Sequence, residues 1–217
     1  GSEGGQAPAA AVPAVMLVLV GPPGSGKSTF CTLLMAQSPL QWCHVNQDTI
    51  KQGGQGTREH CVRAATEALR GGVCCAVDRC HVNAEQRQAF LQVGRDLGAE
   101  VHAVVLRLPY NLCVQRVMRR TDHPTLKPVP QSKGVVGRMY KEMEAAGMPS
   151  PSEGFTSVMT CSSEAEVEAA LRAWALYGRP RPPAPATGTA TAASTATVAG
   201  TATAAGTATA AGTATAA

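Results

Sequence analysis

The sequence predicts an α/β domain with a five-stranded parallel β-sheet that is covered by helices on both faces. Short apolar segments alternate with segments of helical periodicity along the chain, and this alternation is typical of a parallel sheet. Residues 15–20 are apolar at every position, as expected for a strand buried on both faces. Right-handed crossovers would place the loops that follow the strands at one edge of the sheet, where ligands bind.

The expected strands are short apolar runs, and the expected helices carry apolar residues on one face. The strands cover residues 15–20, 42–46, 73–77, 101–108 and 155–161. The helices cover residues 27–37, 57–70, 84–97, 111–120, 133–146 and 164–177. Gly98 and Gly147 follow two of these helices as termination signals. Residues 121–131 are rich in proline and polar side chains, which predicts an irregular segment.

Charge divides the 217-residue chain into a globular part and a low-complexity tail. All 19 basic and 15 acidic residues lie before residue 184, and the hexapeptide GTATAA repeats three times from Gly200 to the end. Such a tail has too few large apolar side chains to offset the entropy of ordering. We expect a disordered segment at 1–13, one globular domain at 14–178, and a Pro-rich, then Ala/Thr/Gly-rich linker at 179–217. Because the chain starts at Gly1 and ends in a linker, we interpret it as a fragment of a longer protein.

Composition excludes several classes of protein. A 44% hydrophobic content with both signs of charge does not fit a disordered protein, a coiled coil or a small disulfide scaffold. The longest apolar run, residues 9–20, is shorter than a membrane span and lacks the flanks of a signal peptide. The eight cysteines contain no CxxC spacing, so we expect reduced core thiols of an intracellular protein rather than a zinc site. The net charge of +4 permits an anionic partner.

One motif predicts the chemistry most directly. Residues 21–28 read GPPGSGKS and match the Walker A pattern between an expected strand and an expected helix. The glycines would let backbone N–H groups surround phosphates at a helix N-terminus. Lys27 would reach the β- and γ-phosphates of ATP, and the Ser28 hydroxyl would bind Mg²⁺. The expected nucleotide-binding residues are Gly21, Gly24, Ser25, Gly26, Lys27, Ser28 and Thr29.

Two aspartates follow neighbouring apolar segments. Asp48 comes after the second expected strand, where a carboxylate could accept the proton of an attacking hydroxyl. Asp78 ends the third expected strand in a Walker B pattern, which holds Mg²⁺ directly or through water. Asp78 could instead bind the phosphate acceptor, and either aspartate could be a helix cap or a turn residue.

Basic residues form two further candidate groups. Arg116, Arg119 and Arg120 lie close together on one expected helix before the irregular segment, as in a lid that closes over a transferring phosphoryl group. The alternative is a solvated basic face. Arg79, Asn83 and Arg87, with His81 beside them, could line a cationic groove for the acceptor, although each alone is compatible with a surface role.

The order of these motifs resembles the P-loop kinase domain of 5′-hydroxyl polynucleotide kinases, over residues 15 to about 177. The similar strings include GPPGSGKSTFC at 21–31, Gln47-Asp48, VDRC at 77–80, EQR at 85–87 and EGF at 153–155. The resemblance implies that Lys27 and Ser28 hold ATP and Mg²⁺ and that Asp48 is the general base. It also implies that Arg116 and Arg120 are lid arginines and that Asp78 lies next to the acceptor.

Within this group, the sequence resembles the kinase-like module of plant and algal aprataxin-like proteins. The acceptor site departs from the kinase pattern, since Lys51 stands where an arginine is frequent and Arg79 follows Asp78. Lysine cannot make the bidentate phosphate contact of arginine. Both departures affect acceptor binding, for which the expected residues are Lys51, Asp78, Arg79, Asn83 and Arg87.

The resemblance implies ATP-dependent phosphorylation of polynucleotide 5′-hydroxyls in DNA strand-break repair, with DNA ends favoured over RNA ends. It implies a nuclear location, with the cytoplasm as the alternative, and no membrane partner. Two other functions stay open at this point. One is a small-metabolite kinase. The other is a module that binds ATP and nucleic-acid ends without catalysis and serves a downstream histidine-triad domain absent from this chain.

Overall fold

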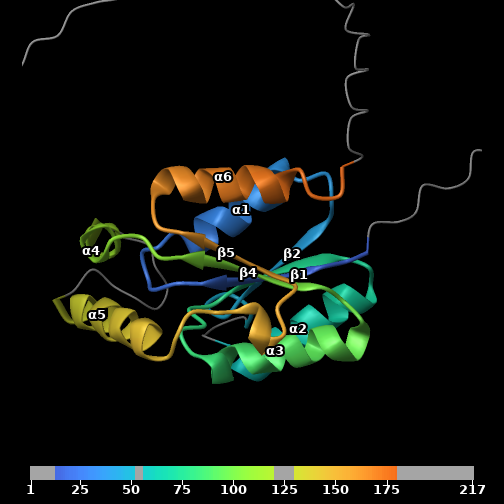
Figure 1. Ribbon diagram of the computed structural model, residues 1–217, viewed down its shortest axis with the longest axis horizontal. Coiled ribbons are helices and arrows are strands. Elements are labelled where there is room, and N and C mark those ends of the chain that lie inside the picture. The colour runs from blue at the N-terminus through green and yellow to red at the C-terminus, as the bar shows by residue number, and fades with distance from the viewer. Residues whose placement is uncertain (1–12, 52–55, 120–129, 180–217) are drawn as a thin grey trace, which may run out of the picture. The chain divides into compact units, whose positions relative to one another are not determined.

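The computed structural model describes residues 13–51, 56–119 and 130–179. These residues form a parallel β-sheet between two layers of helices (Figure 1). The sheet has five strands in the order β2-β3-β1-β4-β5. The strands are β1 Met16–Val20, β2 Trp42–Asn46, β3 Cys74–Asp78, β4 Val101–Leu106 and β5 Ser157–Cys161. The predicted fold class is confirmed.

Strand β1 occupies the centre of the sheet because it pairs with β3 on one side and with β4 on the other. Its side chains alternate between the two faces, as the pleat requires. Met16 and Val18 enter the core beneath α2 and α3, whereas Leu17 and Leu19 enter the core beneath α1 and α6, and all four are fully buried. The strand order reverses at β1, so the loop after β1 lies where ligands bind in such sheets.

The helices cover both faces as the periodicity predicts. They are α1 Lys27–Gln37, α2 Arg58–Arg70, α3 Ala84–Leu97, α4 Tyr110–Arg119, α5 Pro130–Ala145 and α6 Glu164–Ala175. Figure 1 shows α1 and α6 on one face of the sheet and α2 and α3 on the other. Helices α4 and α5 pack against each other at the end of the sheet through a small core that contains Cys113, Val117 and Val136.

The predicted strands and helices differ from the observed ones only at their ends, and one short helix is additional. Strand β4 ends at Leu106 rather than at residue 108, and α5 begins three residues earlier than predicted. A short 3₁₀ helix, Pro151–Glu153, was not predicted. It begins at a proline and ends at Gly154, which has a left-handed φ of 112°. Most of the predicted irregular segment and Arg120 lie outside the described residues. Among the described helices, none is long and apolar enough to span a bilayer.

Two residues that we predicted to bind substrate form hydrogen bonds within the fold. Asn83 is the N-cap of α3, since its Oδ1 accepts from the Gln86 N–H at 3.0 Å, and its Nδ2 donates to Glu142 at 2.8 Å. Arg87 is 1% exposed and cannot line an open groove. Both side chains therefore have hydrogen-bond partners within the fold, and their role in substrate binding remains a prediction.

The Arg87 guanidinium holds α3 to the 3₁₀ helix. Its Nε and NH2 groups donate to the two carboxylate oxygens of Glu153, each at 2.8 Å, and its NH1 group donates to the His81 carbonyl at 2.9 Å. A guanidinium that is buried to this extent needs such a bidentate partner. His81 is itself 1% exposed and, because burial lowers its pKa to about 3, it stays neutral.

The substitution Glu153→Gln should destabilise the domain by about 3–5 kcal/mol, because it leaves the Arg87 charge buried without its counter-ion. The free energy of unfolding, measured by chemical denaturation, checks this value. Glu168→Gln is the matched control, since it breaks an ion pair with Arg172 whose side chains are 66% and 62% exposed. That loss should stay below about 1 kcal/mol. Equal losses for the two variants would contradict the structural role of Arg87.

Candidate functional site

The loop between β1 and α1 has the backbone of a phosphate-binding loop. Gly24 and Gly26 have left-handed φ values of 83° and 98°, which glycine adopts readily. The loop is fixed at its start by a hydrogen bond from the Gly21 N–H to the Cys80 carbonyl at 2.9 Å. A Cβ atom at Gly24 would lie 2.3 Å from the carbonyl oxygen of Cys113 in α4. The glycine spacing therefore brings the loop and α4 into direct backbone contact.

Lys27 is folded back onto this loop. Its Nζ donates to the carbonyl oxygens of Gly21 at 2.9 Å and Pro22 at 3.0 Å, and the residue is 8% exposed. Next to it, the Ser25 hydroxyl is buried and has no hydrogen-bond partner among the described residues. A buried ammonium group and an unpaired hydroxyl in one loop suit an anion that can accept hydrogen bonds from both.

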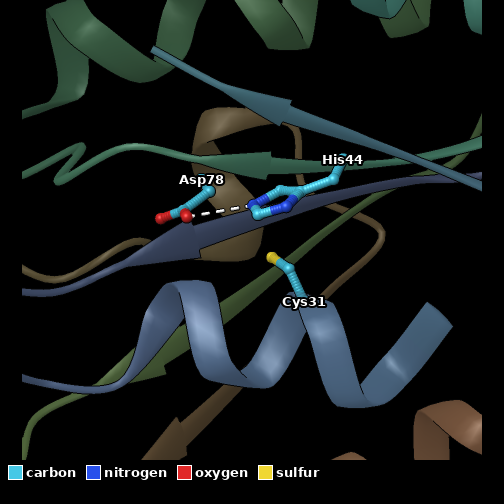
Figure 2. Close-up of side chains that lie close together, drawn as sticks. All are labelled: Cys31, His44 and Asp78. Atoms are coloured by element: carbon cyan, nitrogen blue, oxygen red, sulfur yellow. Dashed lines mark hydrogen bonds and ion pairs between the residues drawn. The ribbon is translucent and has the colours of Figure 1, made fainter. Parts of the chain in front are cut away.

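Asp78 is held by two side chains of the neighbouring strand. Its Oδ2 accepts from His44 Nε2 at 3.0 Å and from Asn46 Nδ2 at 3.1 Å, and the residue is 5% exposed (Figure 2). Burial alone would raise the pKa of the Asp78 carboxyl, but the hydrogen bond from His44, the charge of Lys27 and a hydrogen bond from Ser28 together lower it. Asp78 is thus a carboxylate at neutral pH, and it lies beside the loop residues Lys27 and Ser28.

Asp48 lies in the turn after β2 and is joined to Asp78 through Asn46. The Asn46 Oδ1 accepts from the backbone N–H of Asp48 at 2.8 Å, while the Asn46 amide donates to Asp78. Both aspartates therefore lie at the carboxyl-end edge of the sheet, as we predicted. His44 and Asn46 were not predicted as site residues. They follow Trp42 at intervals of two residues, so all three side chains lie on the same face of β2. Because Trp42 packs toward α1 and α6, this spacing could have indicated that His44 and Asn46 face the helix that carries Lys27.

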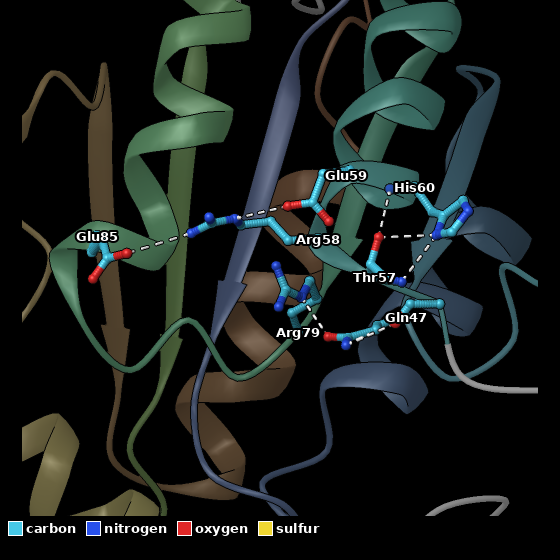
Figure 3. Close-up of polar contacts among 8 residues, drawn as sticks. Gln47, Thr57, Arg58, Glu59, His60, Arg79 and Glu85 are labelled. Atoms are coloured by element: carbon cyan, nitrogen blue, oxygen red, sulfur yellow. Dashed lines mark hydrogen bonds and ion pairs between the residues drawn. The ribbon is translucent and has the colours of Figure 1, made fainter.

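Arg79, which follows Asp78, forms a polar group with Gln47, which precedes Asp48 (Figure 3). Arg79 Nε donates to Gln47 Oε1 at 2.7 Å, and Gln47 donates to the Gly56 carbonyl at 3.0 Å. The NH1 atom of Arg79 is buried and has no hydrogen-bond partner among the described residues. Burial, together with the nearby charge of Arg58, lowers the pKa of Arg79. Lys51 is exposed beyond this group.

A cleft of about 500 Å³ opens between the loop, α4 and α6. Arg116 and Arg119 lie on its α4 side, and Arg116 forms an ion pair with Glu164 of α6. A Cβ atom at Gly26 would lie 3.7 Å from the Arg116 guanidinium, so this side chain is next to the loop. The rest of the lining includes Thr29 and Glu168, but it is mostly apolar and contains Phe30, Leu33, Leu108, Val167 and Leu171. Such a cleft suits a flat apolar group attached to phosphates.

The structure brings the predicted loop residues, both aspartates and Arg116 to one edge of the sheet, and Arg79 lies at the same edge. Arg87 is directed into the core, and Arg120 lies outside the described residues. The predicted roles of these side chains in binding and catalysis remain predictions.

The substitution Gly24→Ala should cost more stability than Gly72→Ala. Both glycines have left-handed φ values, 83° and 72°, but a Cβ at Gly72 would have no neighbour within 4 Å. Gly72→Ala should cost roughly 1–2 kcal/mol from backbone strain alone. Gly24→Ala should exceed it by at least about 1 kcal/mol because of the collision with Cys113. Chemical denaturation of both variants tests this. Equal losses would contradict the close loop–α4 contact.

Comparison with known proteins identifies relatives of this domain. Residues 16–145 match the AAA domain family. A protein of Arabidopsis thaliana named Transcription factor bHLH140 is 38% identical over 164 residues, which are 76% of this chain and 18% of that protein. The Bifunctional polynucleotide phosphatase/kinase of Schizosaccharomyces pombe is 27% identical over 143 residues, which are 66% of this chain and 32% of that protein. The chain thus spans less than a third of the length of these two relatives.

Solved structures share the fold at low sequence identity. The Pnkp1/Rnl/Hen1 RNA repair complex contains a chain with a TM-score of 0.53 and 22% identity, over 61% of this chain and 45% of that chain. A fungal RNA kinase has a TM-score of 0.54 and 16% identity, over 76% of this chain and 87% of that chain. These likenesses agree with the predicted P-loop kinase-like fold. Since the family match covers residues 16–145 and includes the whole phosphate-binding loop, the chain belongs to the AAA domain family.

Proposed function

We propose that this domain transfers the γ-phosphoryl group of ATP to the 5′-hydroxyl of a polynucleotide. The main support is the arrangement at the sheet edge, where Asn46 joins Asp78, beside Lys27, to Asp48 in the next turn. This places a phosphate-binding loop and a second carboxylate on one edge. The relative from Schizosaccharomyces pombe, a polynucleotide phosphatase/kinase by name, supports the choice of acceptor.

The residues of the loop fit a nucleoside triphosphate and Mg²⁺. Within the described part of the chain, the buried Ser25 hydroxyl lacks a partner, and Lys27 could exchange its two carbonyl contacts for phosphate oxygens. Ser28 and Asp78 supply the oxygen ligands that Mg²⁺ prefers. When bound, Mg²⁺ neutralises charge on the phosphates. His44 and Asn46 occupy Oδ2 of Asp78 and so orient its other oxygen.

Asp48 is the general base in this proposal. It accepts the proton of the 5′-hydroxyl while the hydroxyl oxygen forms a bond to the γ-phosphorus and the bond to the β,γ-bridging oxygen breaks. Lys27 stabilises the charge on the transferring group. Arg116, with Arg119 and Arg120 on the same segment of sequence, closes over the phosphates once it leaves Glu164. The cleft beside Phe30 receives the nucleoside.

Lys51 and Arg79 are proposed to bind the phosphate backbone of the acceptor. Arg79 is supported by its buried and unpartnered NH1 group, and Lys51 by its exposure at the same edge. A single-stranded DNA end is the proposed substrate, with an RNA end as the alternative. We further propose a role in DNA strand-break repair in the nucleus, as one module of a larger aprataxin-like protein. The plant relative, of which this chain spans 18%, supports a modular protein.

The substitution Asp48→Asn should lower kcat by about 10²–10⁴-fold and leave ATP affinity nearly unchanged, because only proton transfer is lost. Lys27→Ala should lose both ATP binding and transfer. The measurement is transfer of labelled γ-phosphate from ATP to 5′-hydroxyl DNA and RNA oligonucleotides, with ATP binding measured separately. Asp96→Asn, at an exposed position of α3, is the control.

Normal transfer by Asp48→Asn would overturn the role of Asp48 as base. ATP binding without transfer to any oligonucleotide would favour the second candidate, a module that binds ATP and nucleic-acid ends for another domain. Transfer to a small metabolite alone would replace the polynucleotide by that acceptor.

Acceptor binding should weaken with salt, because Lys51 and Arg79 displace counterions from backbone phosphates. Each phosphate contact to a single strand contributes a slope of about −0.7 in log K against log [salt]. Lys51→Ala should therefore reduce the slope by about 0.7, as measured by fluorescence anisotropy of a labelled oligonucleotide. Arg70→Ala, at the far end of α2, should leave the slope unchanged. A slope near zero for the unaltered chain would contradict a polynucleotide acceptor.

A further inference from the structure

Beneath the phosphate-binding loop, three side chains with metal-ligating atoms converge from three elements. They are Cys31 on α1, His44 on β2 and Asp78 at the end of β3 (Figure 2). One thiol sulfur, one ring nitrogen and one carboxylate oxygen lie within 4.8 Å of one another. Cys31 is four residues after Lys27, so both side chains lie on the same face of α1. Among the described residues, this is the one group of three or more His, Cys, Asp or Glu side chains with such spacing.

We propose that Cys31, His44 and Asp78 form a site for Zn²⁺. Sulfur, imidazole nitrogen and carboxylate oxygen are the ligands that zinc takes in proteins, whereas Mg²⁺ prefers oxygen alone. Three protein ligands leave a fourth tetrahedral position for water. The site is distinct in chemistry from the magnesium site of the proposed function, because that site uses Ser28 and no sulfur or nitrogen donor.

The present geometry lies close to what zinc requires. Bonds of about 2.3 Å to sulfur and about 2.0–2.2 Å to nitrogen and oxygen place tetrahedral ligands roughly 3.4–3.6 Å apart. No two of the three atoms lie more than 4.8 Å apart, so side-chain rotations would have to shorten a separation by at most about 1.4 Å. His44 Nε2 would exchange its hydrogen bond to Asp78 for the metal, and the Cys31 thiol proton would pass to solvent. Asn46 would still hold Asp78.

The strongest consequence concerns Asp78, which belongs to both sites. Zinc on Asp78 would remove the carboxylate that the proposed function assigns to Mg²⁺, so zinc would inhibit phosphoryl transfer. This consequence depends on the proposed function, but the binding of zinc does not. The positive charge of Lys27 is close enough to affect both Cys31 and Asp78. This charge repels a divalent cation and so limits the affinity for zinc. A lower affinity favours reversible binding over a permanent structural site.

The test is a Co²⁺ titration of the full chain, followed by displacement with Zn²⁺. The reductant is a phosphine without thiols. A thiolate-to-cobalt charge-transfer band should appear and saturate at one equivalent. Cys31→Ser should abolish the band and lower the affinity for zinc by at least about tenfold. His44→Gln should lower the affinity for zinc but keep the band. Because the His44 side chain is 20% exposed, this variant is less prone than Cys31→Ser to disturb the core.

Cys161→Ser is the matched control, since Cys161 is a thiol buried to 1% exposure on the far edge strand β5. It should keep the band and the full affinity. A band that survives in Cys31→Ser, or that is lost equally in Cys161→Ser, would overturn the site. Zinc binding by the unaltered chain with no phosphoryl transfer to any acceptor would support the zinc site and count against the proposed function.

Discussion

The need to satisfy one buried carboxylate organises this structure. Asp78 is 5% exposed, and a charge at that depth is stable only with hydrogen bonds and a counter-charge. Its partners come from β2, where Asn46 is in register with Asp78 and His44 lies two residues before it. Lys27 of α1 supplies the positive charge. Strand order, strand register and the position of α1 are all required for this arrangement.

The glycine loop imposes a second constraint, on α4. Because Gly24 lacks a side chain, the backbone of Cys113 can lie against the loop. Helix α4 is thereby fixed so that Arg116 reaches the phosphate-binding region and pairs with Glu164 of α6. The same helix packs on α5 through Cys113 and Val117. The backbone of Arg116 is therefore held in place by the packing of α4. Its side chain forms an ion pair with Glu164.

The buried polar groups of this domain differ in how many of their hydrogen bonds are formed within the protein. Protein side chains occupy Oδ2 of Asp78, which orients this carboxylate, and the buried Arg87 guanidinium is paired with Glu153. Ser25 and Arg79 each keep a buried atom without a partner among residues 13–51, 56–119 and 130–179. Unsatisfied buried donors are costly unless a ligand completes them. This contrast supports placing the nucleotide at the loop and the acceptor phosphate near Arg79. The proposed zinc site of Cys31, His44 and Asp78 shares the Asp78 carboxylate with the nucleotide site.

The sequence by itself determined the alternation of strands and helices, the phosphate-binding loop and the presence of aspartates after two strands. These features depend on local periodicity and on contiguous residues, so no long-range information was needed. The tertiary structure decided the strand order and the partners of Asp78 and Arg87. Arg87 resembled a groove cation in sequence, because its partner Glu153 lies 66 residues away. His44 and Asn46 gained their role only when β2 paired with β3. Pairing between distant segments depends on strand order, which hydrophobic periodicity does not specify.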